Sequence, residues 1–231
     1  RLERLDEAMI GSRAEGIVAR VLAGEIIAYC SDAGMPGVSD PGLRLVRACR
    51  EAGVLVEVLP GPTATATAYV ASGCTNLRFY FGGFFPRKAG DQKAALDAVR
   101  TLDAALIFYE SPNRVAATLD VLAKAFPLRE AAVCRELTKL HEEVVRAALP
   151  ELAAEFAARA AGAGIKGEIV LVIDGPNEAE GQAAQESAED AARTRAQQLK
   201  GEGLRNKDIA KTLAAEFGLP RNVAYDIALE A

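Results

Sequence analysis

The chain has 231 residues, of which 50% are apolar and 26% are charged, and its formal net charge is −5. These values are typical of a globular protein of one or two domains that can bury a hydrophobic core. They exclude a uniformly basic nucleic-acid-binding protein, so any RNA or DNA surface must be a local patch. No apolar run approaches the roughly 20 residues of a membrane span and no signal-like leader is visible, which predicts a cytoplasmic location.

Residues that commonly bind metals are few and scattered. The four cysteines, Cys30, Cys49, Cys74 and Cys134, form no C-x-x-C pair, and His141 is the single histidine. A structural zinc site usually needs clustered cysteine and histidine ligands. We therefore expect neither a metal site nor a disulfide framework.

Short apolar runs alternate with helical patterns through the first three quarters of the chain. The apolar runs lie at residues 26–30, 54–59, 79–84, 105–109, 131–134 and 168–173. The clearest helical patterns lie at residues 41–52, 91–102 and 112–126. Alternation of this kind predicts an α/β fold with largely parallel strand pairing.

The composition changes at Pro176. Residues 177–192 hold five acidic side chains and no basic one, which predicts a solvated acidic linker over 176–190 that grades into a helix. Beyond it, apolar residues at helical spacing are interrupted by Gly203 and by the Gly-Leu-Pro turn at 218–220. The pattern predicts a tail of about three short helices over 191–231.

Three of the apolar runs end in Gly- and Pro-rich turns of the same design, at residues 31–42, 59–64 and 109–114. In the first, Asp40 is the expected N-cap of the next helix, and in the third Ser111 has that role. In α/β sheets, ligands bind beyond the carboxyl ends of strands, where free backbone N–H groups collect. One such turn is ordinary connecting structure, but three favour a pocket. The sequence has no P-loop and no G-x-S-x-G motif.

The same segments carry a family resemblance. Residues 31–42, SDAGMPGVSDPG, resemble the first signature of the small-subunit ribosomal RNA methyltransferase I family, which belongs to the tetrapyrrole-methylase superfamily. Further matches follow in the family's order: LPGP at 59–62, GFFP at 83–86, FYESPNR at 108–114, RELTK at 135–139 with Glu142, and GEI at 167–169. Residues 204–210 and 221–225 resemble the helix-turn-helix appendage of some members.

Two departures from the family pattern stand near the N-terminus. The family normally begins with a strand, a Gly-Asn-Leu-Gly-Asp type loop and an acidic Glu-Asp-Thr-Arg segment, none of which is present here. The resemblance therefore predicts that the first strand segment of the N-terminal domain is missing. Residues 7–11, EAMIG, stand where the family has His-Asn-Glu, so contacts inferred for that segment do not carry over.

The resemblance implies two α/β domains, at residues 1–76 and 77–175, with S-adenosylmethionine bound between them, and a homodimer. It implies methyl transfer to the ribose 2′-hydroxyl of a cytidine in the decoding region of small-subunit rRNA, on the 30S subunit. Carried over by motif, the implied cofactor contacts are Asp32, Ala33, Gly34, Val38, Asp40, Thr63, Ala64, Tyr109, Leu137, Gly167 and Glu168.

A ribose hydroxyl becomes a good nucleophile only when a base or hydrogen-bond acceptor takes its proton. Glu110 is the first candidate because it directly follows a predicted strand, and Lys139 and Glu142 are the next. The alternative for Glu110 is an ion pair with Arg114, four residues later. Basic residues near the expected cleft suit RNA phosphates; those expected to contact RNA are Arg87, Lys88, Arg114 and Arg135.

Two other functions stay open. A methylase of a corrin or porphyrin precursor would share the fold and the cofactor, although the corrinoid branch typically has Gly-Gly-Asp-Pro where this chain has AGMP at 33–36. A non-catalytic DNA-binding regulator could instead rest on the helical tail, but it would leave the elaborate loop at 31–42 unexplained.

Overall fold

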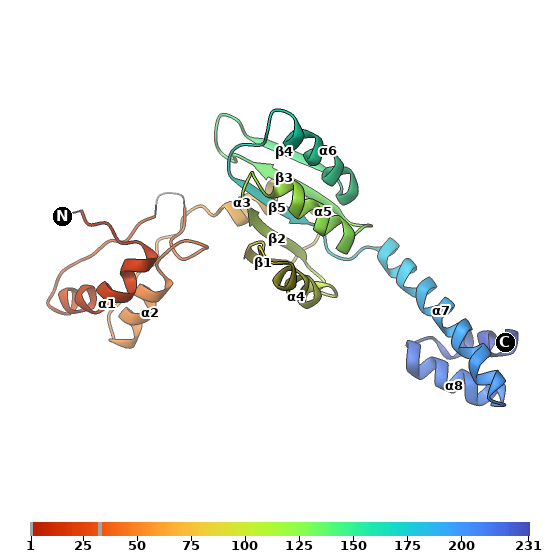
Figure 1. The fold of residues 1–231 in the computed structure, drawn as a ribbon. Helices are drawn as coiled ribbons and strands as arrows, with labels where there is room; N and C mark the ends of the chain where they lie inside the picture. The colour runs from red at the N-terminus through yellow and green to blue at the C-terminus, as the bar shows by residue number, and fades with distance from the viewer. Residues whose placement is uncertain (1, 32–33) are drawn as a thin grey trace. The chain divides into compact units, whose positions relative to one another are not determined.

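The computed structural model describes residues 2–31 and 34–231. The chain divides into two compact units, Arg1–Gly175 and Pro176–Ala231. Figure 1 draws the second unit in blue tones. The unit boundary therefore falls at the composition change seen in the sequence, and the division expected at residue 76 lies inside the first unit.

The centre of the first unit is a five-stranded sheet. Its strands are β1 (Phe79–Phe84), β2 (Ala105–Glu110), β3 (Glu130–Arg135), β4 (Glu143–Ala148) and β5 (Ile169–Ile173), in the order β1-β2-β5-β3-β4. Only β1 and β2 pair in parallel, so among the described strands the expectation of largely parallel pairing was wrong. A short connection joins β3 to β4, and strands so joined must run antiparallel. β5 then enters between β2 and β3 and runs opposite to both.

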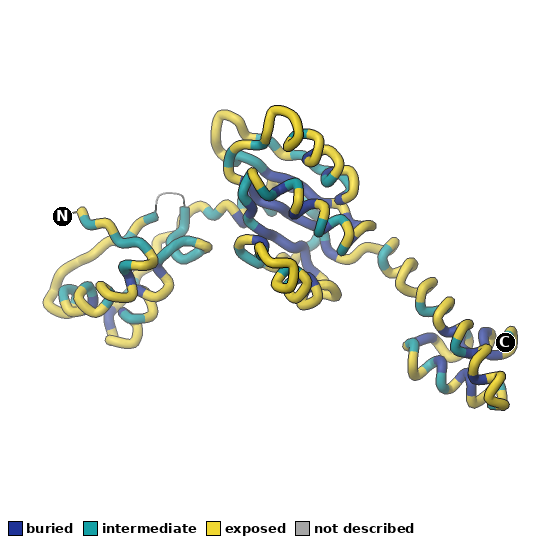
Figure 2. Tube along the Cα trace, viewed as in Figure 1, coloured by how far each residue is buried: buried dark blue, intermediate teal, exposed yellow. Residues whose placement is uncertain are grey.

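Helices cover the two faces of the sheet unequally (Figure 1). α4 (Ala89–Val99), α5 (Val115–Ala125) and α6 (Leu149–Ala161) pack on one face through a large apolar cluster. On the opposite face, α3 (Ala64–Ala71) packs through Ala68 against side chains of β2, β3 and β5. Successive strand residues point to opposite faces, and the inner strands β2, β3 and β5 are buried along most of their length (Figure 2).

The N-terminal part of the first unit is helical. α1 (Glu7–Leu22) and α2 (Leu43–Glu51) pack around a small cluster that includes Ile10 and Leu45. The apolar runs at 26–30 and 54–59, expected to be strands, form no strand, and Ile26 is fully exposed. An apolar run becomes a strand only when a neighbouring strand satisfies its backbone groups, and no described segment pairs with these two runs.

Both expected helix caps were also displaced. α2 begins at Leu43 with Gly42 at the N-cap, so Asp40 does not cap it. α5 begins at Val115 with Arg114 at the N-cap, because residues 111–114 first close a turn in which the Arg114 N–H donates to the Ser111 carbonyl. In both cases a turn precedes the helix and delays its start.

The second unit holds three helices among its described residues: α7 (Glu178–Gly201), α8 (Asn206–Phe217) and α9 (Arg221–Glu230). They enclose their own apolar cluster, which includes Leu199, Leu213 and Ile227. The helical tail was therefore predicted correctly. The acidic segment 176–190, expected to be a linker that grades into a helix, is helical from Glu178, and the Asn177 side chain caps it by accepting the Glu180 N–H at 2.9 Å.

Candidate functional site

Five strand ends meet at one edge of the sheet. Phe84 at the end of β1 lies beside Tyr109, and Glu110 at the end of β2 lies beside Ile169 at the start of β5. Arg135 at the end of β3 pairs with the same Ile169 and with the first residue of β4. The topology thus gathers the motifs at 83–86, 108–114, 135–139 and 167–169 along this edge, which we call the motif edge.

Glu110 lies in the protein interior at the motif edge. Its side chain has no exposed surface, and it accepts the Ser111 N–H at 2.7 Å and the Thr118 hydroxyl at 2.6 Å. The Arg114 guanidinium lies 3.2 Å from the same carboxylate and also donates to the carbonyls of Phe85 and Pro86. The pairing with Arg114 that the sequence allowed is therefore present. The catalytic role of Glu110 stays a prediction, and its contacts are those of a structural anchor.

The other two candidates for the proton acceptor lie in the turn between β3 and β4. Lys139 donates to Glu136 at 2.9 Å and to Glu168 at 3.0 Å, and these two carboxylates raise its pKa. A lysine with a raised pKa stays charged at neutral pH and cannot accept a proton. Glu142 is exposed, and one of its oxygens accepts the Thr138 N–H at 2.6 Å.

Two of the predicted cofactor contacts, Tyr109 and Leu137, join one apolar cluster on the α3 face of the sheet. The Tyr109 ring packs on Phe81 with centroids 4.9 Å apart, and its hydroxyl is hydrogen-bonded to that of Thr65 at 2.8 Å. At the start of the same helix, Thr63 caps α3 by accepting the Ala66 N–H, and Ala64 is exposed. The predicted Gly167 and Glu168 lie at the motif edge beside Glu136.

Of the predicted cofactor contacts in the loop at 31–42, Asp32 and Ala33 lie outside the described residues. Gly34 has a φ of +118°, and a Cβ there would lie 2.8 Å from the Pro62 carbonyl oxygen. That carbonyl also accepts the Met35 N–H at 3.0 Å. Gly34 therefore lets the loops at 31–42 and 59–63 approach each other closely. Val38 and Asp40 are half-buried in the same loop.

The loop at 31–42 also reaches the motif edge. A Cβ added at Gly83, just before the end of β1, would lie 3.7 Å from the Ser39 hydroxyl oxygen. Ser39 itself has a φ of +58°, in the left-handed region that disfavours a side chain. Strained backbone of this kind concentrates at functional sites, which supports a site formed by this loop and the motif edge.

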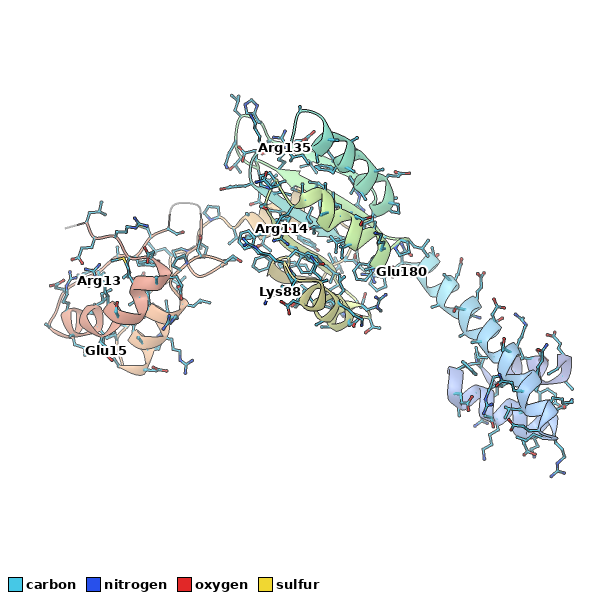
Figure 3. The ribbon with its side chains drawn as sticks, viewed as in Figure 1. Arg13, Glu15, Lys88, Arg114, Arg135 and Glu180 are labelled. Carbon is cyan, nitrogen blue, oxygen red and sulfur yellow. The ribbon has the colours of Figure 1, made fainter. Side chains whose placement is uncertain are left out.

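The four residues expected to contact RNA differ in their freedom to do so. Figure 3 shows Lys88, Arg114 and Arg135 along the same side of the sheet. Arg114 is anchored on Glu110, and Arg135 pairs with Glu143 at 2.9 Å. Arg87 and Lys88 are exposed, and neither forms an ion pair with the residues that the structure describes. They are the two cations of this set that can meet a phosphate without breaking an internal contact.

Three residues that hold this edge together were missed as site residues: Thr118, Glu136 and Glu143. Thr118 is a buried hydroxyl on α5, and Glu143 is held by Arg135 and Arg159. Although desolvation by burial opposes it, the hydrogen bonds from these two arginines lower the pKa of the Glu143 carboxyl. Membership of the RELTK motif was the one signal for Glu136. The other two have partners distant in sequence, so no local pattern marks them.

No helix within residues 2–31 and 34–231 is both long and apolar enough to cross a membrane. In the same described part of the chain, no three His, Cys, Asp or Glu side chains are grouped as a metal site would require.

Comparison with known proteins supports the resemblance found in the motifs. Residues 3–153 match the family described as Tetrapyrrole (Corrin/Porphyrin) Methylases. A protein of Escherichia coli O157:H7 named Ribosomal RNA small subunit methyltransferase I is 40% identical over 235 residues, covering 100% of this chain and 78% of the relative. The protein of the same name from Mycobacterium tuberculosis H37Rv is 38% identical over 233 residues, with the same two coverages.

Solved structures share the fold at low sequence identity. The methyltransferase CobJ has a TM-score of 0.54 at 18% identity and matches 74% of this chain and 72% of its own. A diphthine synthase has a TM-score of 0.56 at 15% identity and matches 75% of this chain and 69% of its own. At this level of identity the likeness supports the fold alone.

Proposed function

The chain belongs to the tetrapyrrole methylase family and, within it, to the ribosomal RNA small subunit methyltransferase I group, and we propose that it methylates a ribose 2′-oxygen of small-subunit rRNA. The target is a cytidine in the decoding region, presented on the assembled 30S subunit. The observation that carries the proposal is the 40% identity with the E. coli relative, because it extends over the whole chain. The motifs of the motif edge lie within that match.

S-adenosylmethionine would supply the methyl group. Main chain at the motif edge is open to a ligand at Gly83, which has a positive φ and no side chain. Beside it, Tyr109 and Leu137 provide an apolar wall of the kind that receives an adenine ring. These residues fit the cofactor. Together with Gly34, Thr63 and the rest of the loop at 31–42, they would hold it.

The reaction is then mainly a matter of positioning, since the attacking oxygen, the methyl carbon and the sulfur must lie in line. A side chain that accepts the hydroxyl proton must be accessible to the substrate and must itself be unprotonated at that moment. Of the three candidates, Glu110 is buried and Lys139 is held in its charged form. We therefore propose the exposed Glu142 as the acceptor, with Glu110 anchoring the Arg114 side chain.

RNA binding is assigned to Arg87 and Lys88, the two exposed cations that follow β1. The double substitution Arg87→Ala/Lys88→Ala should raise the KM for 30S subunits several-fold and leave the cofactor Kd unchanged. Lys93 and Lys124, which lie nearby on α4 and α5 in exposed ion pairs, provide the matched control. Their double substitution to Ala should change neither constant.

The test is transfer of a tritiated methyl group to 30S subunits from a strain that lacks the corresponding methylation. Labelled RNA is then hydrolysed in alkali, because a methylated 2′-oxygen blocks cleavage of the following phosphodiester. We expect label on 30S subunits, in an alkali-resistant dinucleotide that begins with cytidine, and none on free nucleosides. Label on a base, or transfer to a corrin or porphyrin precursor but not to 30S subunits, would contradict the proposal.

A further inference from the structure

The turn that follows β3 has an unusual backbone. Glu136 has a φ of +50° and Thr138 a φ of +65°, so left-handed residues stand on both sides of Leu137. With Ser39, these are the non-glycine residues of positive φ in the described part of the chain. A side chain makes this conformation costly, and it persists only where the surroundings over-determine it.

Hydrogen bonds with Glu168, the residue before β5, hold this turn in place. The Glu136 N–H donates to the Glu168 carbonyl at 3.0 Å, and the Glu168 N–H donates to the Glu136 carboxylate at 2.8 Å. The Glu136 carbonyl accepts the Lys139 N–H at 3.0 Å, while the Lys139 ammonium bridges the two carboxylates. One side chain, that of Glu136, thus joins the end of β3, the turn and the start of β5.

Gly167 provides the space that this side chain occupies. A Cβ added there would lie 2.4 Å from the Glu136 Cγ and 2.7 Å from its Oε1, and the φ of Gly167 is +98°. Glycine is therefore required at 167 both by its backbone conformation and by the Glu136 carboxylate that lies over it. The carboxylate is largely shielded, with 19% of the side chain exposed.

Hydrogen bonding also tunes the carboxylate. The Glu168 N–H, followed by the Lys139 ammonium, lowers the pKa of Glu136 below its ordinary value of 4.5. Glu136 is thus charged at neutral pH, and its interactions with both groups are available there.

We propose that Glu136 is a positioning residue for cofactor binding: through Glu168 and Gly167 it holds the backbone of Leu137 in the left-handed turn that the cofactor contacts. The inference rests on the proposed function, because it takes S-adenosylmethionine as the ligand. Glu136 itself does not touch the cofactor. The hydrogen bond to the Glu168 N–H needs an acceptor oxygen but no charge, so an amide at 136 preserves it.

Calorimetric titration of the full chain with S-adenosylmethionine tests this role. Glu136→Ala should raise the Kd at least tenfold, and Glu136→Gln should restore it to within about threefold of the wild-type value. Under saturating cofactor, the KM for 30S subunits should be the same in all three proteins. Glu155→Ala, which removes an exposed carboxylate paired with Arg159 on α6, is the matched control and should leave both constants unchanged.

A folded Glu136→Ala protein with wild-type cofactor affinity would overturn the inference, as would a Gln variant as weak as the Ala variant. If Glu136→Ala does not fold, hydrogen exchange of the wild-type and Gln proteins decides. Saturating cofactor should slow exchange of the amides at 137–139 and 168 in both, and no change there overturns the inference. Failure of the wild-type chain to bind S-adenosylmethionine refutes the proposed function itself, and the positioning role with it.

Discussion

Replacing Glu110 separates a structural role from a catalytic one. Its wholly buried carboxylate accepts hydrogen bonds from Ser111 and Thr118 and pairs with Arg114. In Glu110→Ala these donors lose their acceptor, and breaking a buried ion pair from one side costs about 3–5 kcal/mol. In Glu110→Gln the amide oxygen can still accept from Ser111 and the Thr118 hydroxyl can rotate to accept from the amide. Only Arg114 then faces a donor. We expect the free energy of unfolding of the sheet to fall by about 1–3 kcal/mol.

The assay must report on the sheet alone, because the two units have separate cores and a global unfolding curve would mix them. Hydrogen exchange followed by mass spectrometry in rising urea reports the opening free energy of peptides from β2 and α5. Asp120→Asn is the matched control: Asp120 lies on α5 in an exposed pair with Lys124. Asp120→Asn should lower the opening free energy by at most about 0.5 kcal/mol.

Activity completes the test. At a temperature where the protein is folded, Glu110→Gln should retain methyl transfer within a few-fold of wild type, because the carboxylate is wholly buried and its contacts are internal. If the opening free energy of β2 is unchanged in this variant while turnover falls roughly 10²-fold, the structural reasoning is refuted. Glu110 would then be the proton acceptor, and Glu142 would not.

Three further outcomes are expected. A chain that ends at Gly175 should keep the sheet folded, since the helical tail has its own core; aggregation, or loss of protection in the strands by hydrogen exchange, would show that the tail supports it. Gly34→Val places a side chain against the Pro62 carbonyl at a φ of +118°, so calorimetry should show at least tenfold weaker cofactor binding, about 1.4 kcal/mol. An unchanged Kd in a folded variant would show that the loop at 31–42 is not part of the cofactor site. Burial raises the pKa of the Cys134 thiol to about 12, so iodoacetamide near pH 8 should label the exposed Cys30 and spare Cys134. Peptide mass spectrometry measures labelling at both cysteines, and equal labelling would mean that the α3 face of the sheet opens readily.

Local sequence determined the elements whose signal is itself local. Four of the five strands coincide with apolar runs seen in the sequence. β2, β3 and β5 are inner strands, and strands buried on both faces are nearly continuous apolar segments. β1 is an exposed edge strand, and its run was visible because it is rich in aromatic residues. β4 escaped notice because it is an edge strand with the charged residues Glu143 and Arg146 in it. The helices α1 and α6 were not anticipated either. The ordered motifs identified the family, since each is a short contiguous pattern.

Tertiary structure alone decided which strands pair and what the motif side chains do. The apolar runs at 26–30 and 54–59 are as strand-like in sequence as β2, yet without a pairing neighbour they form no strand. Glu110 and Glu142 are both carboxylates in family motifs, but one is buried on Thr118 and the other is exposed. Glu136 and Gly167 meet across 31 positions of sequence because β3 and β5 lie side by side. Burial, partners and backbone strain depend on residues distant along the chain, so no local pattern encodes them.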